Sequence, residues 1–475
     1  MQTVNIKDIQ GFLISGYSHM RHARYSLLKV EDATLAKKWI GDLADDITDA
    51  TGKTTKNCLN FAITYHGLLA LGMYEENARN FSRPFREGMA TAHRQRLLGD
   101  LDDSSPDNWQ WGGSTSSDQH KEENIHILLM VFGEDEETML ALYNEFEGNL
   151  PQNGLSLVTN LDGVLLKDNK EHFGFRDGIS QPRIEGAGKQ GNKNNTVKPG
   201  EFLLGYKNEY NVFPETPLIT KPQGEMDLLA NDDENPDKKN FGRNGTYLVF
   251  RQMQQDVDKF WTFINKQNQN PDGTLDEDGS IKMASKMIGR WPSGAPLAKF
   301  PDADPGGLSN DDDFGYYDQD PDGRRCPFGS HLRRNNPRDA FEDNGAAHSI
   351  RLTKKHRIIR RGRSYGVPIV GSPTNHEYEG EVGLHFMCFN ASLERQFEFV
   401  QHTWANYPHF QNLYSDPDPI IGTRQVAMED TVQNFTIQAT PVNQTVKDIE
   451  QFVVIRGGAY FFFPSIAAIH YLATL

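Results

Sequence analysis

The clearest pattern in the chain is an apolar run, then an acidic turn, then apolar residues at helical spacing. In the segment NIHILLMVFGEDEETMLALYNEF the apolar run covers 125–132 and ends at the acids of GEDEE. After this turn, apolar side chains recur on one stripe of a 3.6-residue helix: Met139, Leu142, Tyr143 and Phe146. The pattern predicts a strand followed by an amphipathic helix.

The same order of elements occurs again towards the C-terminus. The segment VGLHFMCFNASLERQFEFVQHTW has its apolar run at 382–389, with Asn390 as the predicted N-cap of the following helix. The helical stripe there consists of Leu393, Phe397, Val400 and Trp404. Two earlier segments, 25–43 and 247–265, also share one order: a short strand, an acidic turn and a helix that contains a tryptophan.

Two copies of strand-helix-strand-strand-helix-strand predict an α+β protein with two ferredoxin-like halves, each an antiparallel sheet with helices on one face. The final strands are expected near 155–163 and 452–463. We place the N-terminal domain at 1–165 and the C-terminal domain at 166–475. Chance similarity between two α+β motifs is the alternative to a duplication.

Long polar stretches separate these elements, at 98–121, 186–245 and 301–350. They are rich in Asn, Asp, Gly and Pro, residues that favour turns. Loops of this length often build binding sites. Disordered insertions are the alternative interpretation.

Composition narrows the class of partner. The chain of 475 residues has 49 Lys plus Arg against 65 Asp plus Glu, a net charge of −16, which disfavours nucleic acid and anionic membrane surfaces as partners. No signal peptide and no membrane-spanning run is recognised, so a cytoplasmic location is expected. The three cysteines are far apart and form no CxxC, which argues against a disulfide framework or a thiolate zinc site.

The segment EHFGFRDGISQPRIEG (171–186) is the first candidate for chemistry. Asp177 is followed by Gly178 and preceded by Gly174, so the backbone can turn tightly and approach a flat ligand. Arg176 and Arg183 are expected to surround the carboxylate and favour its ionised form. The alternative is an ordinary turn in which the aspartate only bonds to the backbone.

The segment RRCPFGSHLRRNNPRD (324–339) holds a single histidine, His331, among five arginines. So many arginines in a chain of charge −16 call for an anionic partner, and the carboxylates of a haem are one candidate, because guanidinium binds carboxylate bidentately. A solvated basic face is the alternative, and a lone histidine is usually structural.

The segment HRIIRRGRSYG (356–366) places Arg360 and Arg361 after two apolar residues. The apolar lead predicts a strand that runs inward and delivers an arginine to the interior, where it requires an anionic or electron-rich partner. An edge strand with exposed arginines is the alternative.

These three segments, in this order, resemble the signature segments of dye-decolourising peroxidases. The resemblance extends to DIQGFLISGY, YLVFRQMQQDV, GRWPSGAPL, GLHFMCFNASLERQFEFVQHTW and RGGAYFFFPS, and so spans nearly the whole chain. The length and the long insertions resemble the larger bacterial members.

The resemblance implies one non-covalent haem b per chain, bound in the C-terminal half; the chain has no CxxCH for covalent attachment. It implies that Asp177 is the distal aspartate, Arg360 the distal arginine and His331 the proximal iron ligand. Leu384 and Phe386 match an apolar pair over the distal face, and strand geometry independently puts them on one face and His385 on the other. His385 departs from the more usual apolar residue, which predicts a polar neighbour behind this strand.

The implied activity is a peroxidase that reduces hydrogen peroxide through a ferryl intermediate and oxidises dyes, phenols or other aromatic reductants. Large substrates would be oxidised at surface tyrosines or tryptophans, and a homo-oligomer is possible. Three alternatives stay open: a haem-handling protein with weak peroxidase activity, a metal-free α+β protein, and a hydrolase that uses Asp177 and His331. The hydrolase is disfavoured because no Ser or Cys nucleophile motif accompanies these residues.

Overall fold

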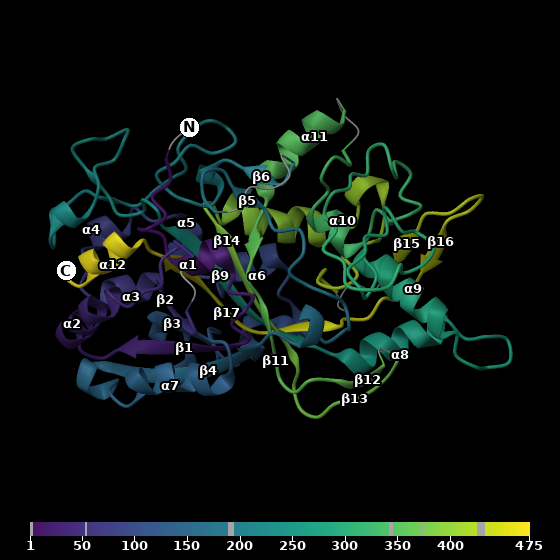
Figure 1. Ribbon diagram of the computed structural model, residues 1–475, viewed down its shortest axis with the longest axis horizontal. Helices are drawn as coiled ribbons and strands as arrows, with labels where there is room; N and C mark the ends of the chain where they lie inside the picture. The colour runs from purple at the N-terminus through teal and green to yellow at the C-terminus, as the bar shows by residue number, and fades with distance from the viewer. Residues whose placement is uncertain (1–2, 53–54, 189–193, 342–344, 373, 425–432) are drawn as a thin grey trace.

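The computed structural model describes residues 3–52, 55–188, 194–341, 345–372, 374–424 and 433–475. Its central feature is a nine-stranded antiparallel sheet in which a half of four strands is joined to a half of five (Figure 1). The first half has the strand order β4-β1-β3-β2, built from β1 (His22–Val30), β2 (Asn57–Ile63), β3 (Ile127–Gly133) and β4 (Leu155–Val164). Helices α2 (Ala33–Ala44) and α7 (Glu136–Glu147) connect its strands.

The second half repeats this plan. Its strands are β9 (Thr246–Gln255), β10 (Ile359–Arg360) with β11 (Arg363–Tyr365), β14 (Gly383–Asn390) and β17 (Val453–Phe463), and β14 pairs with β9, β10 and β11. Helix α8 (Val257–Gln267) follows β9, and a helical segment follows β14. The predicted α+β fold with two ferredoxin-like halves is therefore confirmed. The domain boundary at residue 165 stays a prediction.

The two halves close into one barrel. Val164 of β4 pairs with Ser364 of β11, and Ile63 of β2 pairs with Phe462 of β17. With β14 also bonded to β9, every strand of the ring except the short β10 has a neighbour on each side in the described structure, so few backbone groups are left at an open edge.

Alternate side chains of each strand serve two separate cores. On β3, Leu128, Met130 and Phe132 pack inside the barrel, while Ile127, Leu129 and Val131 pack against the outer helices. A strand buried on both faces reads as a continuous apolar run rather than an alternating one. This explains the run at 125–132 that marks this strand in the sequence.

The acidic turns of the sequence are helix N-caps. Asp32 accepts hydrogen bonds from the backbone N–H groups at the start of α2, Asp135 does so for α7, and Asp256 for α8. The prediction that Asn390 is an N-cap is wrong: it is the last residue of β14, and its Oδ1, the atom that would cap a helix, accepts no hydrogen bond in the described structure.

The helical segment after β14 differs from the expected 3.6-residue helix. It is a π-helix in two pieces, η10 (Glu394–Glu398) and η11 (Val400–Ala405), with backbone bonds such as Glu398 N–H to Leu393 O that span five residues. The predicted stripe is buried nevertheless, because apolar spacings of three and four residues fit either winding. Its members are Leu393, Phe397, Val400 and Trp404.

The remaining helices lie around this barrel. Figure 1 places α2, α3 and α7 at the left of the view with the first half, and α8, α9 and α10 at the right. Their bounds are α1 (Gly11–Ser15), α3 (Tyr65–Ala70), α4 (Glu75–Ala78), α5 (Arg83–Glu87), α6 (Ala92–Leu98), α9 (Glu277–Ile288), α10 (His331–Asn335), α11 (Ala346–Thr353) and α12 (Ile466–Leu472). Among the described residues, none of the helices is both long and apolar enough to cross a membrane.

Candidate active site

The segment 171–178 is a tight turn that presents Asp177. The buried end of Glu171 accepts hydrogen bonds from the backbone N–H groups of Phe173 and Phe175, both at 2.9 Å, and this folds the turn. Gly174 has φ 94° and Gly178 has φ 81°, values that a residue with a side chain rarely adopts. The two glycines therefore serve the backbone path on either side of Asp177.

Asp177 forms an ion pair with Arg360, with 2.9 Å between Oδ1 and Nη1. Arg360 is delivered by β10, which pairs with β14, and its Nη2 also donates to the carbonyl oxygen of Ile179 at 3.0 Å. Burial raises the pKa of Asp177, but the Arg360 guanidinium and the Gly178 backbone N–H outweigh burial, so the pKa lies below its ordinary value. The carboxylate is therefore ionised at mildly acidic pH.

The partner of Asp177 differs from the one expected from the sequence. Arg176 donates to the carbonyl oxygens of Asp168 and Ser309, at 3.2 and 2.8 Å, and Arg183 is exposed. The prediction that these two arginines surround the carboxylate is wrong, because the turn directs Arg176 towards neighbouring backbone. Arg360, which follows Asp177 by 183 positions in the chain, takes their place.

A cavity of about 1400 Å³ opens onto this ion pair. Asp177, Arg360 and Leu384 line it from the second half of the chain. Its opposite wall comes from the first half and includes Leu13, Ser15, Ala50 and Val164. The cavity therefore lies where the two halves meet.

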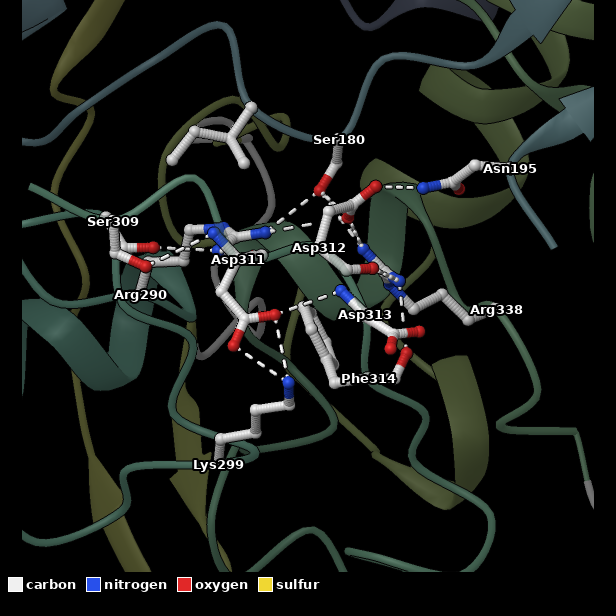
Figure 2. Close-up of polar contacts among 12 residues, drawn as sticks. Ser180, Asn195, Arg290, Lys299, Ser309, Asp311, Asp312, Asp313, Phe314 and Arg338 are labelled. Atoms are coloured by element: carbon white, nitrogen blue, oxygen red, sulfur yellow. Dashed lines mark hydrogen bonds and ion pairs between the residues drawn. The ribbon is translucent and has the colours of Figure 1, made fainter. Parts of the chain in front are cut away.

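One edge of this cavity carries a cluster of buried charges (Figure 2). The carboxylate of Asp312 binds Arg338, Ser180 and Asn195, and Arg290 lies 3.8 Å from it. Arg357 contacts the same cluster through Asn195 Oδ1 at 3.0 Å and the carbonyl oxygen of Ser180 at 3.1 Å.

The charges of this cluster do not balance. Burial and the neighbouring Arg338 lower the pKa values of Arg290 and Arg357 only to about 10, so these guanidinium groups stay charged at neutral pH. Three guanidinium groups share the carboxylate of Asp312. With Lys299, Asp311 and Asp313 of the same cluster included, four cationic side chains meet three carboxylates. The cluster has an excess of positive charge at the edge of the cavity.

His331 is the first residue of α10 and is held by a carboxylate that the sequence analysis missed. Its Nδ1 lies 2.9 Å from Oδ2 of Asp418, which is fully buried. Burial raises the pKa of Asp418, but His331 and the backbone N–H of Ile421 outweigh burial and hold it far below its usual range. Asp418 therefore accepts the proton on Nδ1, and the lone pair on Nε2 is left for another partner. The only local signal for Asp418 is its position between two prolines in DPDPI.

His331 acts electrostatically on Asp177. The histidine is close enough to contribute to the lowered pKa of Asp177, although 154 positions separate them in the chain. The residues that line the cavity include Asp177 and Arg360 but not His331, so a site shared by all three stays a prediction.

Most of the arginines around His331 have partners within the protein. Arg333 binds the carboxylate of Asp320 at 2.9 Å, and Arg334 donates to three backbone carbonyl oxygens, including that of Trp404 at 2.8 Å. Arg325 donates to the carbonyl oxygen of Ala298. These guanidinium groups hold the 301–338 loops together, and haem carboxylates as the partners of the arginine run stay a prediction. Arg338 alone joins the cluster at the cavity edge.

The apolar pair lies as strand geometry predicts. Leu384 and Phe386 are partly buried on one face of β14, and Leu384 lines the cavity. His385 points to the barrel interior, where its Nε2 lies 3.1 Å from the carbonyl oxygen of Asp162 and its ring stacks on Tyr365. The expected polar neighbour is thus a backbone carbonyl.

These residues fit a haem better than a bare metal ion. Within the described residues, no three His, Cys, Asp or Glu side chains form a group that could hold a metal ion. A single imidazole whose Nδ1 is bonded to a carboxylate is the usual arrangement for a metal-binding histidine, and it suffices when a porphyrin supplies the other ligands. The excess positive charge near Arg338 suits carboxylates of such a group.

The comparisons with known proteins agree. No family model matches the chain. A dye-decolorizing peroxidase of Exidia glandulosa is 28% identical over 99% of this chain and 87% of its own length, and a multifunctional dye peroxidase of Amycolatopsis sp. is 27% identical over 94% and 86%. The solved structure of an ancestral D-type dye-decolorizing peroxidase matches with a TM-score of 0.78, at 27% identity over 100% of both chains.

The relatives come from organisms as different as Exidia and Amycolatopsis, so the expected membership in a larger bacterial type stays a prediction. The similarity to dye-decolorizing peroxidases nevertheless covers nearly the whole chain in sequence and all of it in fold. This chain belongs to the dye-decolourising peroxidase family and is a haem-dependent peroxidase.

Proposed function

We propose that Asp177 and Arg360 act on hydrogen peroxide at one face of a haem, and that His331 binds the iron from the other face. The observation that carries this proposal is the Asp177–Arg360 ion pair at the wall of a cavity, within electrostatic reach of a histidine whose Nδ1 is already engaged. One haem b per chain, bound without covalent links, fits a chain that lacks CxxCH. When bound, this group supplies iron redox chemistry that accepts two oxidising equivalents from peroxide and passes them on singly.

Asp177 is the proton carrier in this proposal. Breaking the O–O bond of hydrogen peroxide heterolytically requires moving a proton from one oxygen to the other, which then leaves as water. A carboxylate within hydrogen-bond reach accepts the first proton and returns it to the departing oxygen. Because Arg360 holds only Oδ1 at 2.9 Å, Oδ2 is the oxygen assigned to peroxide.

Arg360 stabilises the negative charge that develops on the departing oxygen. A fixed donor aimed at developing charge contributes about 3–4 kcal/mol to a transition state. Arg360 is fixed at two points on its side chain, Nη1 by Asp177 and Nη2 by the carbonyl of Ile179, and its backbone N–H donates to Gln181. It therefore needs little reorganisation when the charge appears.

His331 and Asp418 form the proximal pair. With Nδ1 donating to Asp418, the imidazole presents Nε2 to the metal in one tautomer. Arg338, with its neighbours in the cluster around Asp312, is the candidate partner for the carboxylates of the haem. Leu384, which lines the cavity, and Phe386, on the same face of β14, would cover the distal side and limit the access of water to the peroxide site.

Aromatic reductants are the proposed second substrates. The relatives include a protein named a multifunctional dye peroxidase, and aromatic electron donors suit a haem that is oxidised by peroxide. Dyes and phenols too large for the cavity would transfer electrons at surface tyrosines or tryptophans. Tyr414, at 80% exposed, and Tyr407, at 49%, are candidates, and Arg334 of the His331 helix α10 binds the Tyr407 carbonyl.

The absorption spectrum of the haem-loaded protein tests the site. The wild type is expected to show the Soret band of a five-coordinate ferric haem, and His331→Ala to lose it. Asp177→Asn is expected to keep the spectrum but to react with peroxide at least about a hundredfold more slowly in stopped-flow mixing, the typical contribution of a general base. Asp168→Asn, nine positions before Asp177 and outside the ion pair, is the matched control.

Two results would overturn these assignments. An unchanged spectrum in His331→Ala would move the iron ligand elsewhere, and a wild-type rate in Asp177→Asn would remove Asp177 from proton transfer. A wild-type protein that binds haem but reacts with peroxide only slowly would instead identify a haem-handling role.

A further inference from the structure

Asn335 lies one helical turn after His331 on α10 and contacts the same carboxylate. Its Nδ2 is 2.7 Å from Oδ2 of Asp418 and 2.8 Å from the carbonyl oxygen of His331. The imidazole Nδ1 is 2.9 Å from that same Oδ2. Histidine and asparagine therefore share one oxygen of Asp418, and their nitrogens are 3.2 Å apart.

The other oxygen of Asp418 is also occupied. Its Oδ1 accepts the backbone N–H groups of Ile420 at 2.9 Å and Ile421 at 3.0 Å. Arg424 donates to the Asp418 carbonyl oxygen at 2.6 Å and to that of Gly422 at 3.1 Å, which holds the 418–422 turn in place. The carboxylate cannot rotate away without breaking several bonds, so its position relative to His331 is set by the fold.

The orientation of the Asn335 amide follows from its neighbours. An ionised carboxylate only accepts hydrogen bonds, so the amide must direct its nitrogen, not its oxygen, towards Asp418. As a result, Oδ1 of Asn335 is buried without a hydrogen-bond partner among the described residues. An unsatisfied buried acceptor is destabilising, and the shared bond to Asp418 is what offsets this cost.

A second donor on the same oxygen weakens the first. Hydrogen bonds to an anion stabilise its charged form and lower its affinity for a proton, so each added donor reduces the pull on the others. Without Asn335, Oδ2 would draw the Nδ1 proton more strongly, and the imidazole would gain anionic character. A more anionic imidazole favours ferric over ferrous iron, because ligand basicity tunes the metal.

We propose that Asn335 is a positioning residue that limits the pull of Asp418 on His331 and thereby raises the reduction potential of the bound iron. This inference rests on the proposed role of His331 as the iron ligand. Asn335 touches neither the peroxide site nor the iron. It acts through its hydrogen bond to Asp418, which in turn holds His331.

The test measures the ferric/ferrous midpoint potential of the haem-loaded protein, and the iron–histidine stretching frequency of the ferrous form by resonance Raman. Asn335→Leu keeps the branched shape but removes the donor. It is expected to lower the potential and raise the stretching frequency. Asp418→Asn weakens the carboxylate and is expected to shift both quantities in the opposite direction.

A double variant and a matched control isolate the mechanism. In the Asp418→Asn background, Asn335→Leu is expected to cause little further shift of the midpoint potential, because the carboxylate charge on which Asn335 acts has been removed. The neighbouring Asn336 is also buried at the end of α10 but has no hydrogen bond to Asp418 in the described structure. Asn336→Leu is therefore expected to leave the potential at its wild-type value.

The outcomes separate this inference from the proposed function. If Asp418→Asn shifts the potential and Asn335→Leu leaves it unchanged or raises it, the role of Asn335 is refuted while His331 stays the ligand. If none of these variants moves the potential or the stretching frequency, His331 is not the ligand and both proposals fail. If Asn335→Leu does not fold, Asn335→Ser serves instead, since its shorter hydroxyl bonds to the helix backbone and not to Asp418; the same lowering is expected.

Discussion

Replacing Arg360 by methionine tests both effects assigned to this residue. The substitution removes the guanidinium while keeping an unbranched side chain of similar length on β10. Loss of the donor to the departing oxygen is expected to slow the reaction with peroxide by about 100- to 1000-fold at pH 7, which corresponds to about 3–4 kcal/mol of transition-state stabilisation. The folded protein should change little, because a half-exposed ion pair contributes about 1 kcal/mol or less.

The same substitution should change the pH dependence. Arg360 is the main group that lowers the pKa of Asp177, against burial, which raises it. A base works only when ionised, so activity falls as the pH drops through the pKa of Asp177. In the wild type this acid limb is expected below the ordinary pKa of an aspartate, and without Arg360 the opposing effect of burial moves it to higher pH.

Stopped-flow mixing with peroxide between pH 3 and 8 measures both quantities. The second-order rate constant, followed by the change in the Soret band, gives the size of the loss and the position of the acid limb. Arg360→Lys retains a charge but not the forked geometry of a guanidinium. Compared with Arg360→Met, it should return the acid limb close to its wild-type pH while the rate constant stays well below that of the wild type. A rate within threefold of the wild type, or an acid limb that does not move in Arg360→Met, would refute this account of the distal pair.

Three further predictions concern stability. Phe132→Ala should lower the free energy of unfolding by about 3–5 kcal/mol, measured by denaturant titration, because the ring is fully buried inside the barrel; a loss below about 1 kcal/mol would contradict its place there. Asp135→Ala should cost about 1 kcal/mol by removing the N-cap of α7, whereas the adjacent Glu136→Ala should cost less. Burial raises the pKa of Glu171 to about 7, so the unfolded chain releases this proton at lower pH than the folded protein does. The free energy of unfolding should therefore fall as the pH rises from about 4.5 to 7. Glu171→Gln should flatten that part of the profile of melting temperature against pH, and an unchanged slope would show that Glu171 titrates normally.

The secondary structure and the main site residues can be predicted from the sequence because their signals are local. Strands β3 and β14 appear as apolar runs, and the aspartate N-caps of α2 and α7 appear as acidic turns. Asp177 and Arg360 lie in short segments with glycines or apolar leads, and these segments also carry the family resemblance. The structure adds their contact at 2.9 Å.

Other features leave no local signal. The π-helical winding of 394–405 satisfies the same apolar spacing as an α-helix, so the pattern does not distinguish them. Asp418 lies 87 positions from His331, and nothing in its own segment marks it as the partner of a histidine. The arginines of 324–338 look alike in sequence, yet Arg333 holds a buried aspartate while Arg338 joins the cavity edge.

By itself, the sequence determined the order of strands and helices, the α+β class and the segments that carry the chemistry. Only the tertiary structure decided that the two sheets close into one barrel, through single pairings at Val164–Ser364 and Ile63–Phe462. It also decided which arginine faces Asp177 and which carboxylate holds His331. The physical reason is range: periodicity and capping depend on residues a few positions apart, whereas these contacts join positions tens to hundreds apart, whose proximity depends on how all the elements pack.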